Sequence, residues 1–271
     1  MTRTIAYMLA VSMTFIFSVA NAENYGLCLD GVEVTSENAS DPLGNGVFCY
    51  HPETKILDVN GIYHATTWAA IENVGVDGLI INIANQSELS ASKWAVIYIE
   101  QNTTITGTDT LKVVGEDCYG IWVAETSVLT VDKAQMKVSG VYQGITGNRD
   151  AGFNSYEGIV ICNSYLEVTA KEGSWDMYTS DDVWAMGYFL KEFILDNSSI
   201  SFPDKAFIHE GTIFANDNNL ADKVIITPNL SGTNHNYNKS EKFFYDLQGR
   251  KVTNPRKGEI YIQNGKKYIN K

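Results

Sequence analysis

The stretch that decides the fold is residues 119–170. It reads YGIWVAETSVLTVDKAQMKVSG over 119–140, then restarts with GIT at 144–146 and GIVICNSYLEVTA at 158–170. Apolar and polar residues alternate in short runs, and Gly, Asn, Asp or Ser interrupts each run, which predicts short strands rather than helices. A strand this short cannot bury its apolar face alone, so the repetition predicts a solenoid in which each coil covers its neighbour.

The same alternation recurs outside this stretch, at residues 102–107, 135–140, 165–170 and 198–203. The starts of these segments lie 33, 30 and 33 residues apart. Because that spacing exceeds a minimal three-strand coil, loops are expected at the corners, the largest at 171–183. We therefore predict an all-β protein: a right-handed parallel β-helix over residues 62–228, preceded by an antiparallel cap over residues 23–61 that covers the open end of the solenoid.

The two ends of the chain have different characters. Residues 1–22 have the pattern of a signal peptide, since Arg3 precedes an apolar run and Ala20-Asn21-Ala22 supplies a small-x-small cleavage pattern. No later run approaches the roughly 20 apolar residues of a membrane span, so no transmembrane segment is expected. Residues 229–240 are predicted to be a polar linker, and residues 241–271 a small hairpin module with Asn264-Gly265 at its turn. The predicted location is secreted or at the outer cell surface.

Charge is divided between the body and the tail. Residues 23–238 contain ten Lys plus Arg against 29 Asp plus Glu, whereas residues 239–271 contain nine against three. An acidic body repels polyanions, so no nucleic-acid partner is expected.

Four cysteines follow the predicted cleavage site. An exported compartment permits disulfides, and Cys28 with Cys49 is the preferred pair because both lie on short predicted strands near the amino terminus. The alternative is that the cysteines are free, with Cys118 and Cys162 packed inside the coil as small hydrophobes.

Two stretches resemble known families. The segment GVFCYHPETKIL at 46–57, with the later Gly-Ile and Leu-x-Val ladders, resembles secreted right-handed parallel β-helix proteins of Bacteroidetes that are described as carbohydrate-binding-domain proteins. That family is similar in turn to pectin-binding β-helices that use calcium. The segments FYDLQGRKV at 244–252 and KGEIYI at 257–262 resemble the carboxy-terminal sorting module of proteins exported by the type IX route. These resemblances imply a glycan or surface polysaccharide as one partner and the export machinery as another.

Candidate ligand-binding residues are aromatic side chains expected on the outer face. If Ile121 and Val123 point inward, Trp122 points outward, because side chains alternate along a strand. Further candidates share this reasoning or lie in or beside the predicted loop at 171–183: Trp94, Tyr98, Trp175, Tyr178, Asp181, Asp182 and Trp184. Aromatic rings stack on sugar faces while polar groups hold the hydroxyls. The equally open alternative is that these rings only cover a corner of the coil.

A metal site and catalysis have less support in the sequence. Asp217, Asn219 and Asp222 provide hard oxygen ligands that suit calcium, although Asx turns that bond their own backbone explain the same residues. No nucleophile elbow, zinc-protease motif or P-loop is present. We therefore expect no enzyme and no catalytic residue. The leading hypothesis is a non-catalytic carbohydrate-binding protein; the alternatives are a structural adhesin that binds a protein, and a lyase or hydrolase acting on uronic-acid polymers.

Overall fold

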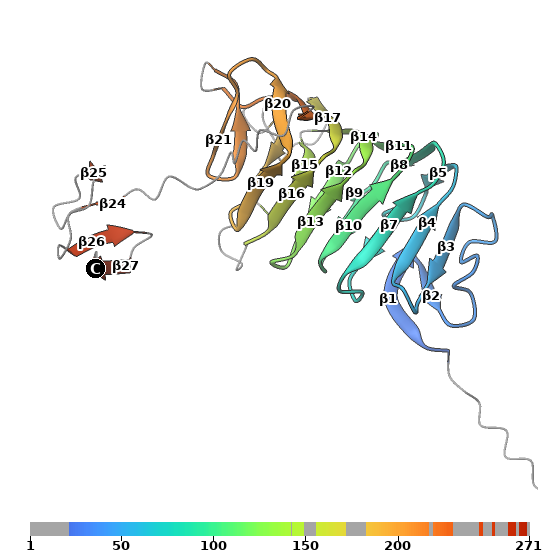
Figure 1. Ribbon diagram of the computed structural model, residues 1–271. Helices are drawn as coiled ribbons and strands as arrows, with labels where there is room; N and C mark the ends of the chain where they lie inside the picture. Colours follow the sequence, from blue (N-terminus) through green and yellow to red (C-terminus); the bar gives the residue numbers. More distant parts are fainter. Residues whose placement is uncertain are drawn as a thin grey trace, which may run out of the picture.

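The computed structural model describes residues 22–141, 143–148, 156–171, 183–216 and 219–229, together with four short strands between residues 244 and 269. Throughout these residues the chain is all-β, with no helix (Figure 1). This confirms the predicted fold class.

Three seven-stranded sheets form the body of the protein. Sheet A contains β1 (Asn24–Leu29), β2 (Val32–Thr35), β6 (Ile71–Asn73), β9 (Ala95–Ile99), β12 (Tyr119–Val123), β15 (Gln143–Thr146) and β18 (Trp184–Gly187). Sheet B contains β3 (Phe48–His51), β4 (Ile56–Val59), β7 (Leu79–Ile83), β10 (Thr103–Gly107), β13 (Val128–Asp132), β16 (Gly158–Cys162) and β19 (Glu192–Asp196). Sheet C contains β5 (Ile62–Ala65), β8 (Ser87–Ala91), β11 (Thr110–Gly115), β14 (Gln135–Val141), β17 (Tyr165–Lys171), β20 (Ser198–Phe202) and β23 (Lys223–Pro228).

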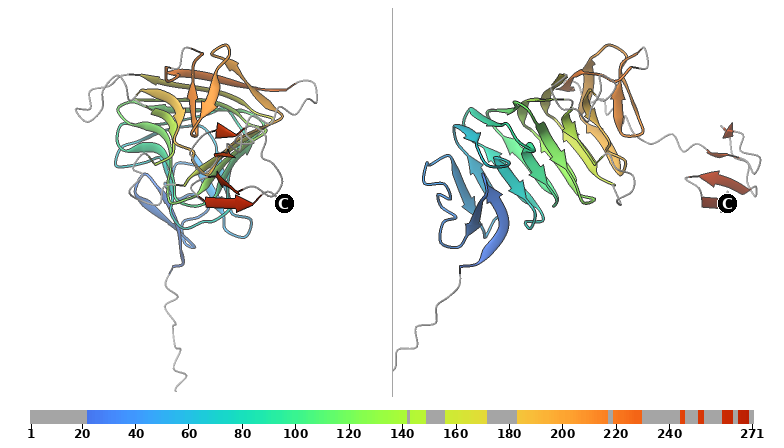
Figure 2. Two further views of the ribbon diagram at one scale, coloured as in Figure 1. Left: turned by 90° about the vertical axis from the view of Figure 1, so that its left-hand side faces the viewer. Right: turned by 180° about the vertical axis from the view of Figure 1, so that it is seen from behind.

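The chain visits the sheets in the order B, C, A and then repeats. Five strand triplets result, β4–β5–β6, β7–β8–β9, β10–β11–β12, β13–β14–β15 and β16–β17–β18, and each strand pairs in parallel with its equivalent in the next triplet. As predicted, the molecule is a parallel β-solenoid; it has about four turns, and the right-hand view of Figure 2 shows the coils in chain order from behind.

The core consists of inward-facing side chains stacked coil upon coil. In sheet A, Ile97 lies over Ile121, which lies over Ile145, and all three side chains are fully buried. Because like residues stack on like, each coil removes the apolar face of its neighbours from water, at roughly 25 cal/mol per Å² of apolar surface. The predicted restart of the pattern at residue 144 is confirmed by the parallel pairs β12–β15, β13–β16 and β14–β17.

The coil length is not constant, and the predicted alignment of residues 102–107 with residues 135–140 is wrong. Within residues 102–107, Thr103–Gly107 form β10 in sheet B, whereas the strand in register with β14 is β11, where Leu111 pairs with Met136. The early coils therefore advance by 24 to 26 residues, as in the pairs Ile56–Ile80 and Thr103–Leu129. The pair Gly158–Glu192 advances by 34 residues, because residues are inserted at the corners. Alternating Thr and Ile suit either sheet, so the pattern at 102–107 did not identify its sheet.

Glycine marks the corner at which sheet C gives way to sheet A. A Cβ atom added to Gly120 would lie 2.6 Å from Cγ1 of Val138, and one added to Gly144 would collide in the same way with Val168. Any larger residue would push sheets A and C apart at this corner. The repeated Gly-Ile dipeptide in the sequence marks the positions of this close approach.

Antiparallel strands close both ends of the solenoid. At the amino-terminal end β1 pairs antiparallel with β2 and β6, and β3 pairs antiparallel with β4. At the other end β23 lies between β17 and β20 and is antiparallel to both, so the expected parallel continuation at residues 198–203 is wrong. The hairpin of β21 (Phe207–His209) and β22 (Thr212–Phe214) packs on β18. Antiparallel pairing therefore caps sheets A and B at the amino-terminal end and sheet C at the other end, which limits edge pairing with other chains there. The strands β5, β18 and β19 remain terminal strands with only a parallel neighbour in their sheets.

The cysteine prediction is corrected by the structure. Cys28 lies on β1 in sheet A and Cys49 on β3 in sheet B, and all four cysteines are free. The two turns between them carry the chain from one sheet to another rather than bringing the two sulfurs together. Cys118 is fully buried in the core, as the alternative predicted, whereas Cys162 is only half-buried.

The carboxy-terminal segment forms a small antiparallel sheet of its own. It contains β24 (Phe244–Tyr245), β25 (Lys251–Val252), β26 (Ile260–Gln263) and β27 (Lys266–Ile269). β26 and β27 pair from Ile260–Ile269 to Gln263–Lys266, which confirms the hairpin predicted around Asn264-Gly265.

Candidate functional site

The outer face of sheet A carries a ladder of large side chains across successive coils. Glu72 on β6 is in register with Tyr98 on β9, Tyr98 with Trp122 on β12, and Trp122 with Thr146 on β15. These residues point away from the core because their neighbours, such as Ile97 and Ile121, point into it. The parallel coils thus place residues 24 or 26 positions apart in the sequence directly beside one another.

Five aromatic rings form one continuous cluster on this face. Trp68 stacks on Trp94 with ring centroids 5.0 Å apart and planes 19° apart, and Trp94 lies 4.6 Å from Trp122. Tyr98 and Tyr119 meet Trp122 edge to face, at 5.5 Å and 5.2 Å. Offset stacks and edge contacts of this kind stabilise aromatic pairs beyond the area that they bury.

The rings differ in how much they show to solvent. Trp68 is 39% exposed, whereas Trp94, Tyr98 and Trp122 are half-buried and Tyr119 is buried. The Nε1 atoms of Trp94 and Trp122 are buried without a hydrogen-bond partner among the described residues. Ring packing therefore holds these two indoles in place, and Trp68 is the ring most available to a ligand.

Carboxylates lie beside the rings. The hydroxyl of Tyr98 donates a hydrogen bond of 2.7 Å to Oε1 of Glu100. Burial, this hydrogen bond and the negative charges of Glu100, Glu125 and Glu72 raise the pKa of Tyr98 well above its usual range. Burial, with the nearby charge of Glu100, also raises the pKa of Glu72. The face therefore combines aromatic surface with a concentration of negative charge.

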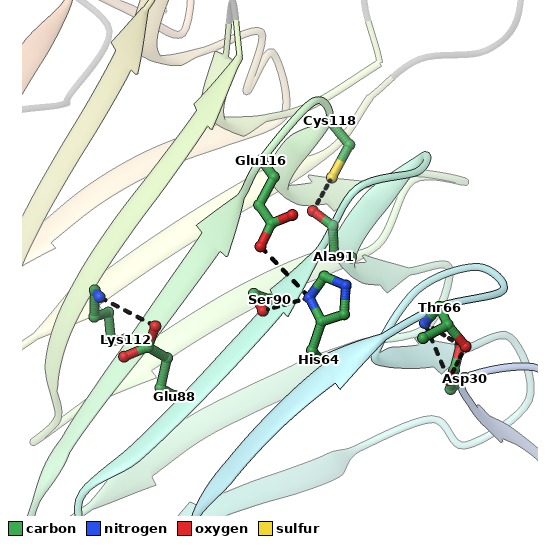
Figure 3. Close-up of polar contacts among 9 residues, drawn as sticks. All are labelled: Asp30, His64, Thr66, Glu88, Ser90, Ala91, Lys112, Glu116 and Cys118. Atoms are coloured by element: carbon green, nitrogen blue, oxygen red, sulfur yellow. Dashed lines mark hydrogen bonds and ion pairs between the residues drawn. The ribbon is translucent and has the colours of Figure 1, made fainter.

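Asp30 anchors the loop that carries Trp68. Its carboxylate accepts a hydrogen bond from the backbone N–H group of Thr66 (Figure 3). It also accepts hydrogen bonds from the backbone N–H group of Thr67 and from the hydroxyl of Tyr63. Although burial works to raise the pKa of Asp30, the hydrogen bonds from Thr67, Thr66 and Tyr63 lower it to about 2. A carboxylate that accepts several N–H donors is strongly stabilised in its charged form. Asp30 is thus a positioning residue for the exposed ring that follows Thr67.

The predicted candidate residues have three different outcomes. Trp94, Tyr98 and Trp122 lie together on the outer face of sheet A, as expected from the alternation. Trp184, by contrast, is 1% exposed, so the expectation that it displays a ring is wrong. It lies at the start of the last strand of sheet A, where the β21–β22 hairpin packs over β18. Trp175, Tyr178, Asp181 and Asp182 lie outside the described residues.

Two members of the cluster, Trp68 and Tyr119, were missed by the sequence reasoning. Trp68 precedes β6 as Trp94 precedes β9, and the two residues are one coil of 26 positions apart, like the pair Ile71–Ile97. Aligning the sequence at that spacing would have found Trp68. Tyr119 starts β12 and has the parity of the inward-facing Ile121, so alternation alone would not have placed its ring beside Trp122.

The predicted calcium ligands do not form a complete set within the described part of the chain. Asn219 and Asp222 are exposed between β22 and β23, where their backbone carbonyls accept hydrogen bonds from Ala215 and Ala170. Asp217 lies outside the described residues. Across the ranges that the structure describes, no group of three or more His, Cys, Asp or Glu side chains is arranged to hold a metal ion.

Two clusters have the residue types of a nucleophile, base and acid but not the required geometry. His64 Nδ1 lies 2.9 Å from Ser90 Oγ and 3.5 Å from Glu116 Oε1 (Figure 3). On sheet B, His51 Nε2 contacts both Asp58, at 3.0 Å, and Cys49, at 3.6 Å. A catalytic triad requires the nucleophile and the acid to contact opposite ring nitrogens of the histidine. In both clusters a single nitrogen faces both partners.

A groove of about 420 Å³ lies at the amino-terminal cap, away from the aromatic cluster. Its lining includes Tyr25, Tyr50, Lys55 and Asp77, and Lys55 Nζ already donates to the carbonyl of Asp77 at 2.9 Å. No predicted ligand-binding residue lines it. The aromatic cluster is therefore a surface platform and not the wall of this groove.

Comparisons of the chain with protein-family models, with curated proteins and with solved structures found no match. In the described part of the chain there is no helix long and apolar enough to span a membrane. One fold can host many functions, and the side chains that the solenoid displays determine which function it has.

Proposed function

We propose that this protein is a non-catalytic carbohydrate-binding β-helix whose ligand lies along the outer face of sheet A. The observation that carries the proposal is the continuous cluster of five rings, with Trp68 exposed at one end and carboxylates beside Tyr98. Rings supply flat apolar surface against the C–H faces of a sugar, and carboxylate oxygens accept hydrogen bonds from its hydroxyls.

The shape of the face favours an extended glycan over a small molecule. The cluster crosses the strands from Trp68 beside β6 to Trp122 on β12, along the direction in which the coils stack. Neighbouring strands lie about 4.8 Å apart, so three coils offer roughly 10 Å of platform. Buried small-molecule sites are concave, whereas a platform of this kind contacts one side of a chain.

A glycan array with the intact protein tests the proposal. Trp68→Ala removes the exposed ring without opening the core, and Phe207→Ala removes a comparably exposed ring, 37% against 39%, from the β21–β22 hairpin. We expect wild type and Phe207→Ala to bind the same glycans and Trp68→Ala to lose most of the signal. Equal binding by all three proteins would place the ligand elsewhere on the molecule.

Absence of signal for every protein on the array would overturn the proposal and favour the structural adhesin. In that case the same three proteins, immobilised and exposed to cell-surface extract, would retain a protein partner. A dependence of this capture on Trp68 would show that the platform recognises protein.

We also propose that the protein is exported, with residues 1–22 removed and residues 241–271 read by a type IX-like export machinery. The sequence patterns of the two ends support this proposal. Amino-terminal sequencing of protein recovered from culture medium or from the cell surface tests it. The expected new terminus is Glu23, and an intact Met1 in intracellular material would contradict export.

A further inference from the structure

We propose that the sheet A platform selects glycans that carry free amino groups, such as polymers of glucosamine, over neutral or acidic ones. This inference rests on the proposed function and narrows it to a class of ligand. It follows from three features of the platform: its charge, the lack of a cation paired with that charge among the described residues, and the identity of its rings.

The first feature is a cluster of three carboxylates around one ring. Glu72 is the register neighbour of Tyr98, Glu100 accepts the Tyr98 hydroxyl, and the charge of Glu125 also acts on Tyr98. They come from three separate places, β6, the turn after β9 and the turn after β12, which the coils bring together. Like charges so close repel one another, and a bound cation relieves that repulsion.

The second feature is that these carboxylates have no cationic partner within the described residues. Their only hydrogen-bond donor there is the hydroxyl of Tyr98, which contacts Glu100. On the outer face of sheet C, by contrast, two glutamates are paired with lysines, Glu88 with Lys112 at 3.1 Å and Glu167 with Lys223 at 2.7 Å. Lys93 precedes Trp94 in the chain and is exposed, but it forms no ion pair with the three carboxylates.

The third feature is the identity of the rings. Trp attracts an ammonium group over its face more strongly than Tyr or Phe does, because of the negative charge above the ring. Three of the five rings are tryptophans: Trp94 contacts both Trp68 and Trp122. A protonated amino sugar can therefore present a C–H face to one ring and an ammonium group to a neighbouring ring or carboxylate.

Charge complementarity decides between classes of glycan. A neutral polymer would cover the three carboxylates without neutralising them, and partly burying unpaired charge is costly. A uronic-acid polymer would add repulsion to that cost. A cationic polymer makes the same ring and hydroxyl contacts and also neutralises the carboxylates.

The test compares two probes of equal length, glucosamine hexamer and its fully N-acetylated counterpart, by titration calorimetry at low and high salt. We expect the wild-type protein to bind the amine-bearing hexamer about tenfold or more tightly than the acetylated one at low salt. The preference should shrink at high salt because surface charges are screened.

Two charge variants show where the preference arises. The triple variant Glu72→Gln/Glu100→Gln/Glu125→Gln should lose the preference while keeping affinity for the acetylated hexamer. Its matched control, Glu37→Gln/Glu53→Gln/Glu210→Gln, removes three exposed carboxylates elsewhere and should keep the preference. A preference lost equally in both variants would indicate bulk charge and overturn the assignment to this platform.

The outcomes separate this inference from the proposed function. Equal affinity of wild type for the two hexamers, with both losing affinity in Trp68→Ala, would overturn the charge preference and leave a carbohydrate-binding platform. Failure of wild type to bind either hexamer, with signal for a neutral or acidic glycan on the array, would overturn the inference alone. No binding to either hexamer and no signal on the glycan array would overturn both this inference and the proposed function.

Discussion

The outer faces of sheets A and C belong to the same coils but have opposite chemistry. On sheet C, charged residues form compensated pairs: Glu88 with Lys112, and Glu167 with both Lys137 and Lys223. On sheet A the equivalent positions hold rings, and the nearby carboxylates have no ion pair among the described residues. Only the inward residues are fixed by stacking, so a solenoid can specialise one face without disturbing the others.

The largest effect is expected from removing the ring at the centre of sheet A's outer face. Trp122 contacts Trp94, Tyr98 and Tyr119. Trp122→Ala should lower the free energy of unfolding by about 2–4 kcal/mol, somewhat less than for a fully buried Trp because the ring is half-buried. Chemical denaturation measures this loss.

Lys112→Ala on sheet C provides the matched comparison. It truncates a long outward side chain that makes one exposed ion pair with Glu88, and should cost less than about 1 kcal/mol. Similar losses for the two variants would mean that the ring cluster contributes no more to stability than a surface pair, which would contradict the contrast between the faces.

The sequence was sufficient to predict the solenoid and three of the five rings of the platform. Alternation and the Gly-Ile corners predicted stacked coils, and the period of two placed Trp122 and Tyr98 outside. The register of 102–107 was not predictable, since Thr103 to Gly107 alternates in the same way as strands of sheet C. The burial of Trp184 could not be predicted either, because the β21–β22 hairpin that packs on its strand comes later in the chain.

An intermediate effect is expected at the anchor of the Trp68 loop. Asp30→Ala leaves the N–H groups of Thr66 and Thr67 without their acceptor, and should cost about 1–3 kcal/mol. Because the pKa of Asp30 is lowered to about 2, its contribution is complete above the usual pKa of an aspartate and is lost as the pH falls toward 2. Denaturation of both proteins over that pH range should show the difference shrinking.

Measurements of glycan binding can distinguish a specific role of Asp30 in placing Trp68 from a general effect on stability. Asp41 also accepts two backbone N–H groups, from Asn45 and Gly46, in a cap loop. Asp30→Ala should weaken glycan binding as Trp68→Ala does, whereas Asp41→Ala should leave it unchanged. If Asp41→Ala weakened binding equally, Asp30 would have no special role in placing the ring.

The smallest expected effects are changes in stability with pH. They have opposite signs on the outer faces of sheets C and A, which makes them easy to tell apart. The hydrogen bond from Lys223 lowers the pKa of Glu167, against some opposing burial. Its stabilisation is therefore present above the usual pKa of a glutamate and lost as the pH falls through the lowered value. Burial and Glu100 raise the pKa of Glu72, so the fold is more stable with Glu72 protonated and loses stability as the pH rises through the raised value.

Glutamine variants turn this difference into a measurement. At pH 7 Glu167→Gln should unfold at a slightly lower temperature than wild type and Glu72→Gln at a slightly higher one, each shift being smaller than that of Asp30→Ala. Each difference should fade as the pH falls through the pKa of its glutamate, first for Glu72, whose pKa is raised, and then for Glu167, whose pKa is lowered, since a protonated glutamate resembles glutamine in charge. Shifts of the same sign at pH 7 would mean that the carboxylates of sheet A are compensated like those of sheet C. That result would remove the uncompensated charge on which selection of an amine-bearing glycan depends.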